Sequence, residues 1–112
     1  MHGLKGERVL MRIHIGERDK YHGKPLHTAI VELLREKGYA GATVLRAIMG
    51  YGAGSRIRTD SIEVLSLDLP IVVECVETAE RIDAILPDLD EMIGGGLITL
   101  EKVNVIAYRP HN

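Results

Sequence analysis

The order of the predicted elements indicates an α+β fold of the ferredoxin-like type, βαββαβ, with an antiparallel sheet and two helices on one of its faces. Three observations predict this fold. Two strand-helix-strand units of similar length follow one another, their helices occupy matching positions, and a long glycine-rich segment separates the units. The length of 112 residues is usual for one domain. We therefore expect a single domain over residues 1–112, with a mobile loop at about 51–62.

The first unit begins with a segment of alternating polarity. From Arg8 to Ile15, every second side chain is apolar, which is the period of a β-strand. The following segment, 24–37, carries leucine and isoleucine at helical spacing, with Pro25 suited to the first turn of a helix and Gly38 to its end. The β-branched and apolar segment 42–50 then predicts the second strand.

The second unit repeats this order. Residues 61–67 predict either a short strand or the returning arm of a long hairpin, and residues 71–76 predict a buried central strand. Thr78 can cap a helix that continues to Met92 with an apolar stripe along one side. Pro87 interrupts this helix, so we expect a kink or a new helical turn there, with the stripe continuing beyond it.

The last extended segment, 97–108, changes the phase of its apolar residues. Ile98 and Leu100 share one parity, whereas the apolar residues from Val103 onwards share the other. A β-bulge at Glu101 and Lys102 would explain the change.

One face of the predicted sheet has no helix to cover it, because two helices can cover only one face. That second face is expected to carry apolar side chains among charged ones, namely Leu10, Val44, Ile48, Val72 and Val76. Association of identical subunits through this face would cover them, and ordinary symmetry would close the subunits into a ring.

Composition limits the classes of function. Hydrophobic residues make up 46% and charged residues 27% of the chain, which is typical of a globular protein. The net charge of −2 and the absence of Trp and Phe argue against a nucleic-acid partner, since such proteins need basic patches and aromatic stacking platforms. No apolar segment approaches the roughly 20 residues that span a membrane, and no signal peptide is recognised at the N-terminus. We therefore expect a cytoplasmic protein, in which the single cysteine, Cys75, is a buried and inert thiol.

A candidate anion-binding loop lies between the two units. Glycines at alternate positions leave their backbone N–H groups uncovered, and arginines follow whose guanidinium groups suit phosphate or carboxylate. The residues are Gly50, Gly52, Gly54, Arg56 and Arg58. The alternative is an ordinary hairpin connection, in which the glycines satisfy turn geometry and the arginines keep the surface polar.

Taken together, these residues resemble the nitrogen regulatory protein PII superfamily, and more closely an uncharacterised PII-like bacterial family within it. The resemblance covers nearly the whole chain. It rests on the order of the elements, on the step Gly50-Tyr51-Gly52 at the start of the long loop, and on Ile93-Gly94-Gly95-Gly96 after the second helix. The resemblance implies a homotrimer of ferredoxin-like domains that binds small effectors, usually adenine nucleotides, in clefts between neighbouring subunits.

The same resemblance implies a phosphate-binding role for the second glycine motif, through the backbone N–H groups of Gly94, Gly95 and Gly96. The alternative is that Gly94 is simply the C′ residue of the helix in the left-handed conformation. The chain also departs from the family pattern, because Ala53 and Leu97 stand where PII proteins carry a basic residue after each glycine motif. Arg56 and Arg58 lie close enough in sequence to substitute.

The expected function is therefore non-enzymatic: a regulator that binds a small anionic effector and responds by ordering a loop, with a transporter or a metabolic enzyme as partner and no cofactor. One alternative is a small enzyme or metal-binding protein of the same architecture, in which His22 and His27, with His14 on the adjacent strand, would hold a metal. The other is a structural trimer without a small ligand. No residue pattern predicts a catalytic site.

Overall fold

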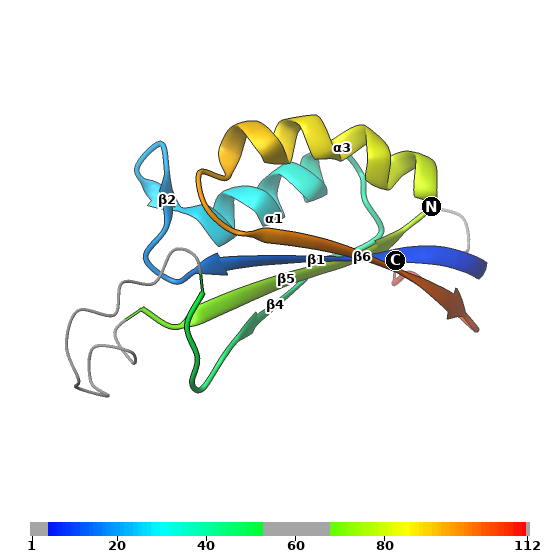
Figure 1. Ribbon diagram of the computed structural model, residues 1–112. Coiled ribbons are helices and arrows are strands. Elements are labelled where there is room, and N and C mark those ends of the chain that lie inside the picture. The colour runs from blue at the N-terminus through cyan, green and yellow to red at the C-terminus, as the bar shows by residue number, and fades with distance from the viewer. Residues whose placement is uncertain (1–4, 53–67, 112) are drawn as a thin grey trace.

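The structure, a computed structural model, describes residues 5–52 and 68–111 of the chain. Four strands form one antiparallel sheet in the order β4-β5-β1-β6. Their bounds are Gly6–Gly16 for β1, Thr43–Arg46 for β4, Pro70–Glu77 for β5 and Leu97–Val105 for β6. The helices α1 (Leu26–Glu36) and α3 (Ala79–Met92) both lie on one face of this sheet (Figure 1). The predicted ferredoxin-like architecture is confirmed.

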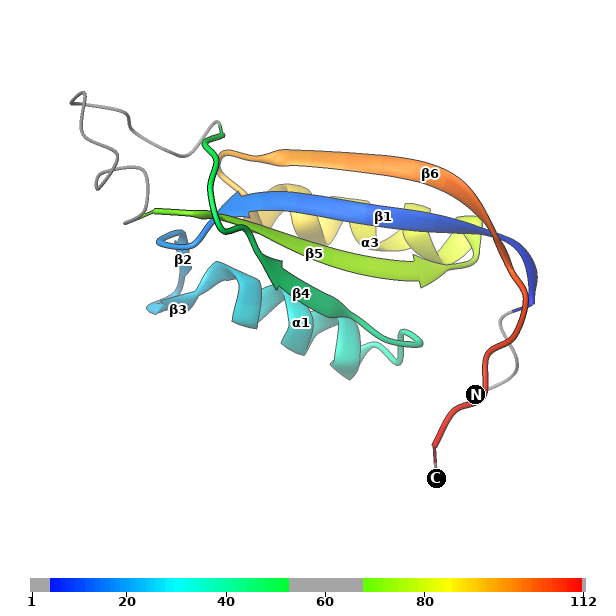
Figure 2. The same cartoon turned by 90° about the horizontal axis from the view of Figure 1, so that it is seen from below.

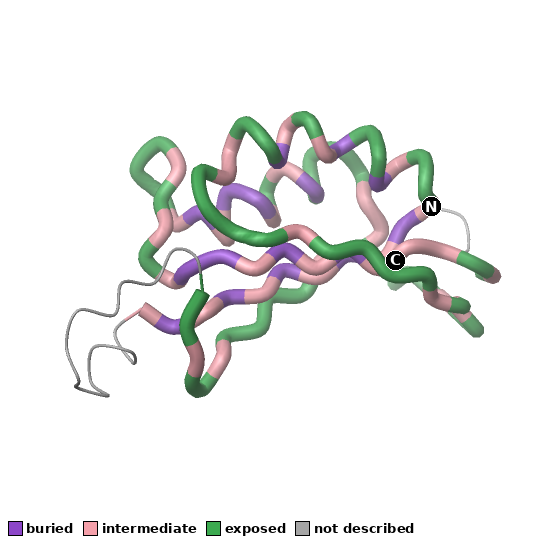
Figure 3. The backbone as a smooth tube through the Cα atoms, in the orientation of Figure 1, coloured by how far each residue is buried: buried purple, intermediate pink, exposed green. Residues whose placement is uncertain are grey.

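The core lies between the sheet and the helices. Alternate residues of β1 and β5 face the helices, and they are paired across the two strands, as Met11 with Cys75 and Ile13 with Val73. All four side chains are buried, and the buried segments in Figure 3 follow the two central strands and the inner sides of the helices. Helix α1 packs against β5 and α3 packs against β1. The alternate buried residues of the strands thus pack against the apolar stripes of the helices, as the sequence predicts.

Helix α3 begins as predicted and continues through its proline. The Thr78 hydroxyl accepts a hydrogen bond from the Arg81 backbone N–H at 3.3 Å, which is the expected N-cap. Pro87 lies inside one continuous helix, and the buried stripe passes it to Leu89. Because the stripe holds the helix against the sheet on both sides of Pro87, the missing N–H does not end the element.

The first helix begins later than predicted. Lys24 and Pro25 form the two-residue strand β3 (Lys24–Pro25), which pairs with β2 (Lys20–Tyr21) in a small hairpin that the sequence reading missed. Pro25 is the N-cap residue of α1, with the extended angles φ −55° and ψ 135°. The hairpin closes where the Leu26 N–H donates to the Asp19 carbonyl at 2.8 Å. Proline disfavours helical angles in the residue before it, so Lys24 is extended and α1 starts after Pro25.

The second strand is shorter than predicted, and one of its residues faces the other way. Strand β4 ends at Arg46. Val44 pairs with the core residue Val73, so it lies on the helix-covered face, and the prediction that placed it on the second face is wrong. Leu45 lies on the second face instead. Ile48 lies beyond the end of the strand and is 97% exposed.

The predicted β-bulge in the last strand is also wrong. Strand β6 pairs with β1 without interruption from His14 opposite Leu97 to Gly6 opposite Val105. The phase change has another cause: Ile98 faces the helices, whereas Val103 and Val105 face the opposite side of the same regular strand. The strand ends at Val105 rather than at residue 108.

No helix of residues 5–52 and 68–111 covers the second face of the sheet, which Figure 2 shows from below. We refer to it as the open face. One row of paired residues crosses all four strands on this face, namely Leu45, Val72, His14 and Leu97. The leucines at its two ends are 48% and 56% exposed.

The next row of the open face is polar, with Arg12 paired to Glu74 and Thr99. The row after it joins Val76 and Leu10 to Glu101. Arg12 donates to Glu74 at 3.0 Å and to Glu101 at 2.9 Å. These hydrogen bonds, first that to Glu74 and then that to Glu101, raise the pKa of the Arg12 guanidinium above its ordinary value. Within residues 5–52 and 68–111, no helix is both long enough and apolar enough to cross a membrane.

Candidate functional site

The two glycine motifs lie at the same end of the sheet, which we call the loop end (left in Figure 1). Strand β1 ends here at Gly16, and β5 and β6 begin here at Pro70 and Leu97. Gly50 lies beside the start of β5, and Gly96 lies beside the last residues of β1. The fold therefore places at one end of the sheet the two segments that the sequence resemblance selected from distant parts of the chain.

Gly50 is held beside β5 by its neighbours. The Ala47 N–H donates to the Pro70 carbonyl at 2.9 Å, which fixes the segment that leaves β4. Gly50 has φ +147°, and a Cβ atom there would lie 3.4 Å from the Cγ atom of Pro70. Gly52 is exposed, with no atom within 4 Å of the place its Cβ would take. Of the first two loop glycines, Gly52 thus leaves its backbone accessible, whereas Gly50 lies against Pro70.

The glycines after α3 divide into two kinds. At Gly96, φ is +159°, and a Cβ would lie only 2.7 Å from the His14 carbonyl oxygen, so this position requires glycine for close packing against β1. Gly94 and Gly95 are exposed and face open space. Neither has a positive φ, so the left-handed C′ conformation considered for Gly94 is not adopted. Helix α3 ends instead at an extended Ile93, whose N–H donates to the Leu89 carbonyl at 2.9 Å.

A charged pair, formed by Arg46 and Glu17, lies at the loop end. Arg46, the last residue of β4, donates from Nε and Nη2 to the two carboxylate oxygens of Glu17 at 2.8 and 3.1 Å. The side chains are 57% and 31% exposed, respectively. The hydrogen bond from Arg46 is the main reason that the pKa of Glu17 lies below its ordinary value. The sequence reading missed Arg46, although a basic residue at the end of an apolar strand, four positions before Gly50, is a usable signal.

The remaining predicted ligand residues lie outside the part of the chain that the structure describes. These are Gly54, Arg56 and Arg58, together with Ala53 and the segment 61–67. Their roles stay predictions.

The alternative of a metal site depends on His14, His22 and His27. Across the described ranges 5–52 and 68–111, no three His, Cys, Asp or Glu side chains come together in a way that could bind a metal. His14 lies on the open face, and His22, whose φ is +48°, stacks on Tyr21 in the hairpin with ring centroids 4.0 Å apart. The Nδ1 atom of His27 is buried without a hydrogen-bond partner.

Cys75 does not suit the role of nucleophile in the alternative of a small enzyme. Cys75 is 2% exposed, and burial raises the pKa of its thiol to about 11. A thiol at this pKa is almost wholly protonated at neutral pH, and the thiolate is the reactive form. The expectation that Cys75 is buried is confirmed.

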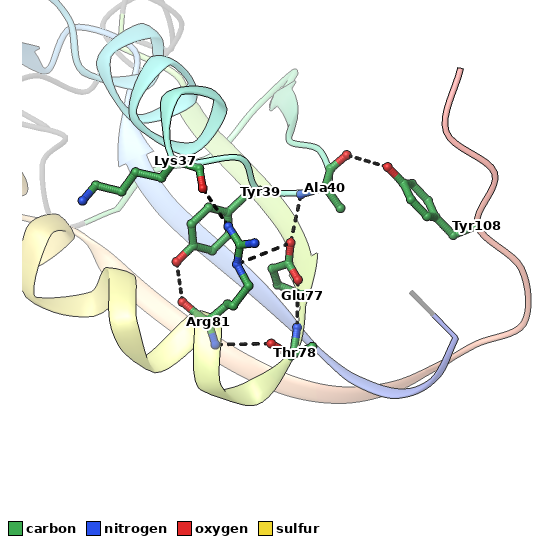
Figure 4. A network of polar contacts seen from close by, with 7 residues as sticks. All are labelled: Lys37, Tyr39, Ala40, Glu77, Thr78, Arg81 and Tyr108. Atoms are coloured by element: carbon green, nitrogen blue, oxygen red, sulfur yellow. Dashed lines mark hydrogen bonds and ion pairs between the residues drawn. The ribbon is translucent and has the colours of Figure 1, made fainter. Parts of the chain in front are cut away.

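The opposite end of the sheet, which we call the far end, is fixed by a polar network around Glu77 (Figure 4). Glu77 is 2% exposed and accepts the backbone N–H groups of Ala40 at 2.9 Å and Thr78 at 3.1 Å. Arg81 lies 4.0 Å from its carboxylate, donates to the Lys37 carbonyl at 2.8 Å and stacks over the ring of Tyr39. This end has no accessible glycine motif and no exposed charge pair among these residues.

A groove of about 400 Å³ also lies at the far end, beside the C-terminal segment. Its walls are mainly apolar and include Leu10, Val76 and Val105, and Tyr108 closes one side by donating from its hydroxyl to the Ala40 carbonyl at 3.2 Å. The only charged residue along it is Glu74, which Arg12 already pairs. An apolar groove of this kind does not suit an anion.

Comparisons with known proteins give one family. Residues 8–105 match the DUF190 family, described as "Uncharacterized ACR, COG1993". Two UPF0166 proteins of Aquifex aeolicus are similar: one is 40% identical over 100 residues, covering 89% of this chain and 94% of its own length, and the other is 35% identical over 99 residues, covering 88% and 97%. A UPF0166 protein of Methanocaldococcus jannaschii is 36% identical over 97 residues, covering 86% and 89%.

Proposed function

This chain belongs to the DUF190 family, and from that premise we propose that it is a non-enzymatic, PII-like regulatory protein. Its ligand is a small anionic effector, an adenine nucleotide, bound in clefts between the subunits of a homotrimer. The observation that carries the proposal is the position of the two glycine motifs at one end of the sheet, with the backbone of Gly52, Gly94 and Gly95 open to a ligand.

The chemistry of the loop end suits a phosphate group. Uncovered backbone N–H groups bind anions without the entropy cost of ordering a long side chain. Gly94 and Gly95 have open space where a side chain would stand, so a phosphate can approach their main chain closely. Arg46 lies at the same end, where its guanidinium pairs with Glu17. The two motifs come from different edges of the sheet, and a neighbouring subunit would bring the second copy of each motif into reach.

Trimer formation is supported by the open face. The row of Leu45, Val72, His14 and Leu97 has an exposed leucine at each end, on a face that neither α1 nor α3 covers. Exposed apolar surface of this kind is typical of a contact between proteins. A second copy has a matching face, and repeated contacts of identical subunits close into a ring.

The effector acts by selecting a conformation rather than by chemistry. Fixing the backbone costs about 1–2 kcal/mol per residue, so a ligand that supplies this free energy can display or hide a surface for a partner protein. A membrane transporter or a metabolic enzyme is the partner that the PII resemblance suggests.

The test is a panel of adenine nucleotides in thermal unfolding. A bound effector raises the melting temperature with the logarithm of its concentration, and a concentration of 100 times Kd stabilises the fold by about 2.7 kcal/mol. Gly95→Asp places a negative charge in the open space of the motif and should abolish the shift. Gly41→Asp is the matched control, because Gly41 is equally exposed and free of neighbours but lies at the far end.

Two results would contradict the proposal. One is a panel in which no nucleotide changes the melting temperature. The other is a monomer by light scattering at the concentration used for binding, since a cleft between subunits then does not exist.

A further inference from the structure

The Arg46–Glu17 pair has the geometry with which arginine binds an anionic ligand. Two parallel N–H groups of the guanidinium meet the two oxygens of one carboxylate at 2.8 and 3.1 Å. Phosphate groups are bound by the same two-pronged contact. The pair is partly exposed on both sides, so a ligand from solvent can reach the guanidinium without unfolding the core.

Further groups around the Glu17 carboxylate also favour a negative charge. The pKa of Glu17 is lowered chiefly by Arg46, and a backbone hydrogen bond from Leu69 and the nearby His27 side chain act in the same direction. We call the groups around the Glu17 carboxylate that lower its pKa, namely Arg46, Leu69 and His27, the cradle.

The cradle and the first glycine motif share one anchor, the corner at Leu69 and Pro70. The Glu17 N–H donates to the Leu69 carbonyl at 2.9 Å, and the Ala47 N–H donates to the Pro70 carbonyl at 2.9 Å. Gly50 lies against the ring of the same proline. The segment 46–50 thus contacts this corner at Ala47 and at Gly50.

We propose that Arg46 is a phosphate-binding residue of the effector site and that Glu17 occupies it as an internal competitor until the effector arrives. The inference rests on the proposed function and adds a named residue and a competing group to it. The effector phosphate replaces the Glu17 carboxylate on the guanidinium, no covalent bond changes, and Glu17 is released to solvent. A phosphate carries more charge and more acceptor oxygens than one carboxylate, so the exchange favours the ligand.

Two other arginines with known partners, Arg81 and Arg12, are not available in this way. Arg81 stacks on Tyr39 and is held in the network at the far end. Arg12 is shared between two glutamates on the open face. Among the described residues, Arg46 pairs with the carboxylate of Glu17, and it lies at the loop end, four residues before Gly50.

Calorimetric titration of the full chain with pyrophosphate and, separately, with ADP tests the inference. Glu17→Gln removes the competing charge and should bind pyrophosphate at least threefold more tightly than the unmodified chain. Arg46→Gln should weaken binding at least tenfold. The control is Glu32→Gln, which breaks another exposed ion pair, that with Lys24 at 2.7 Å, and should leave both affinities unchanged. Melting temperatures without ligand establish that each variant is folded.

The outcomes separate this inference from the proposed function. If ADP binds the unmodified chain and both Arg46→Gln and Glu17→Gln bind it equally well, the inference fails and the proposed function stands. If pyrophosphate binds more tightly to Glu17→Gln but no nucleotide binds to any form, the phosphate-binding role of Arg46 and its competition with Glu17 stand, whereas the adenine nucleotide of the proposed function fails. Absence of pyrophosphate binding in every form, or weaker binding by Glu17→Gln, overturns the inference.

Discussion

The two ends of the sheet each carry a glutamate–arginine pair, and the pairs are built in opposite ways. At the far end, Glu77 is 2% exposed, accepts two backbone N–H groups, and is joined by an arginine that is itself stacked on a tyrosine. At the loop end, Glu17 and Arg46 are 31% and 57% exposed and have glycine segments as neighbours.

The difference shows what each end can do. A buried carboxylate that satisfies backbone donors cannot leave without stranding them, so the far end is a fixed part of the fold. An exposed pair contributes little to stability and can exchange partners. The same two residue types therefore act as structure at one end and as a candidate binding group at the other.

The largest expected effect is at Glu77. Glu77→Ala leaves the N–H groups of Ala40 and Thr78 without their acceptor and Arg81 without its counter-charge. We expect a loss of about 2–4 kcal/mol in the free energy of unfolding, measured by urea denaturation. Glu77→Gln keeps an acceptor oxygen and should lose less. A loss below about 1 kcal/mol for the alanine variant would show that the far end is not the fixed one.

A smaller effect is expected from a matched pair of glycine substitutions at the loop end. Gly96→Ala places Cβ 2.7 Å from the His14 carbonyl oxygen and should cost about 1–3 kcal/mol. Gly95→Ala meets open space at a φ that is not positive and should leave the unfolding free energy nearly unchanged. Urea denaturation of both variants sharpens the division between a packed and an accessible glycine. Equal losses in the two variants would remove it.

The smallest effect is expected from the exposed pair, and it depends on pH. Because the pKa of Glu17 is lowered in the folded state, the pair stabilises the fold above the ordinary pKa of glutamate and loses that contribution as the pH falls through the lowered value. Glu17→Gln should therefore be slightly less stable than the unmodified chain at pH 7, with a difference that disappears in strong acid. A difference that persists in acid would assign the effect to something other than this charge.

Local patterns were sufficient to predict most of the fold. The alternation in β1 and the helical stripe in α3 predicted the buried faces, because both patterns record which side chains meet the core. They failed where tertiary context decides. The phase change in β6 suggested a bulge, yet a regular strand can present apolar residues first to the helices at Ile98 and then to the open face at Val103. The face of Val44 depends on its register with Val73, which no local pattern contains.

The candidate site could be predicted only in part. The glycine motifs were recognisable because several glycines stand close together in the sequence at each of the two positions. The fold brings Gly50 and Gly96 to the same end of the sheet. The partner of Arg46 was not recognisable, since Glu17 lies 29 positions away and only the pairing of β4 and β1 with β5 brings the two together. Charged pairs formed across a sheet leave no periodic signal in the sequence.

The most direct measurement is an amide NMR titration of the full chain with an adenine nucleotide. Binding at the loop end should shift the backbone resonances of Gly52, Gly94 and Gly95 and leave those of Ala40, Gly41 and Glu77 unchanged. Shifts confined to the far end, or no shift at saturating nucleotide, would contradict the assignment of the two ends.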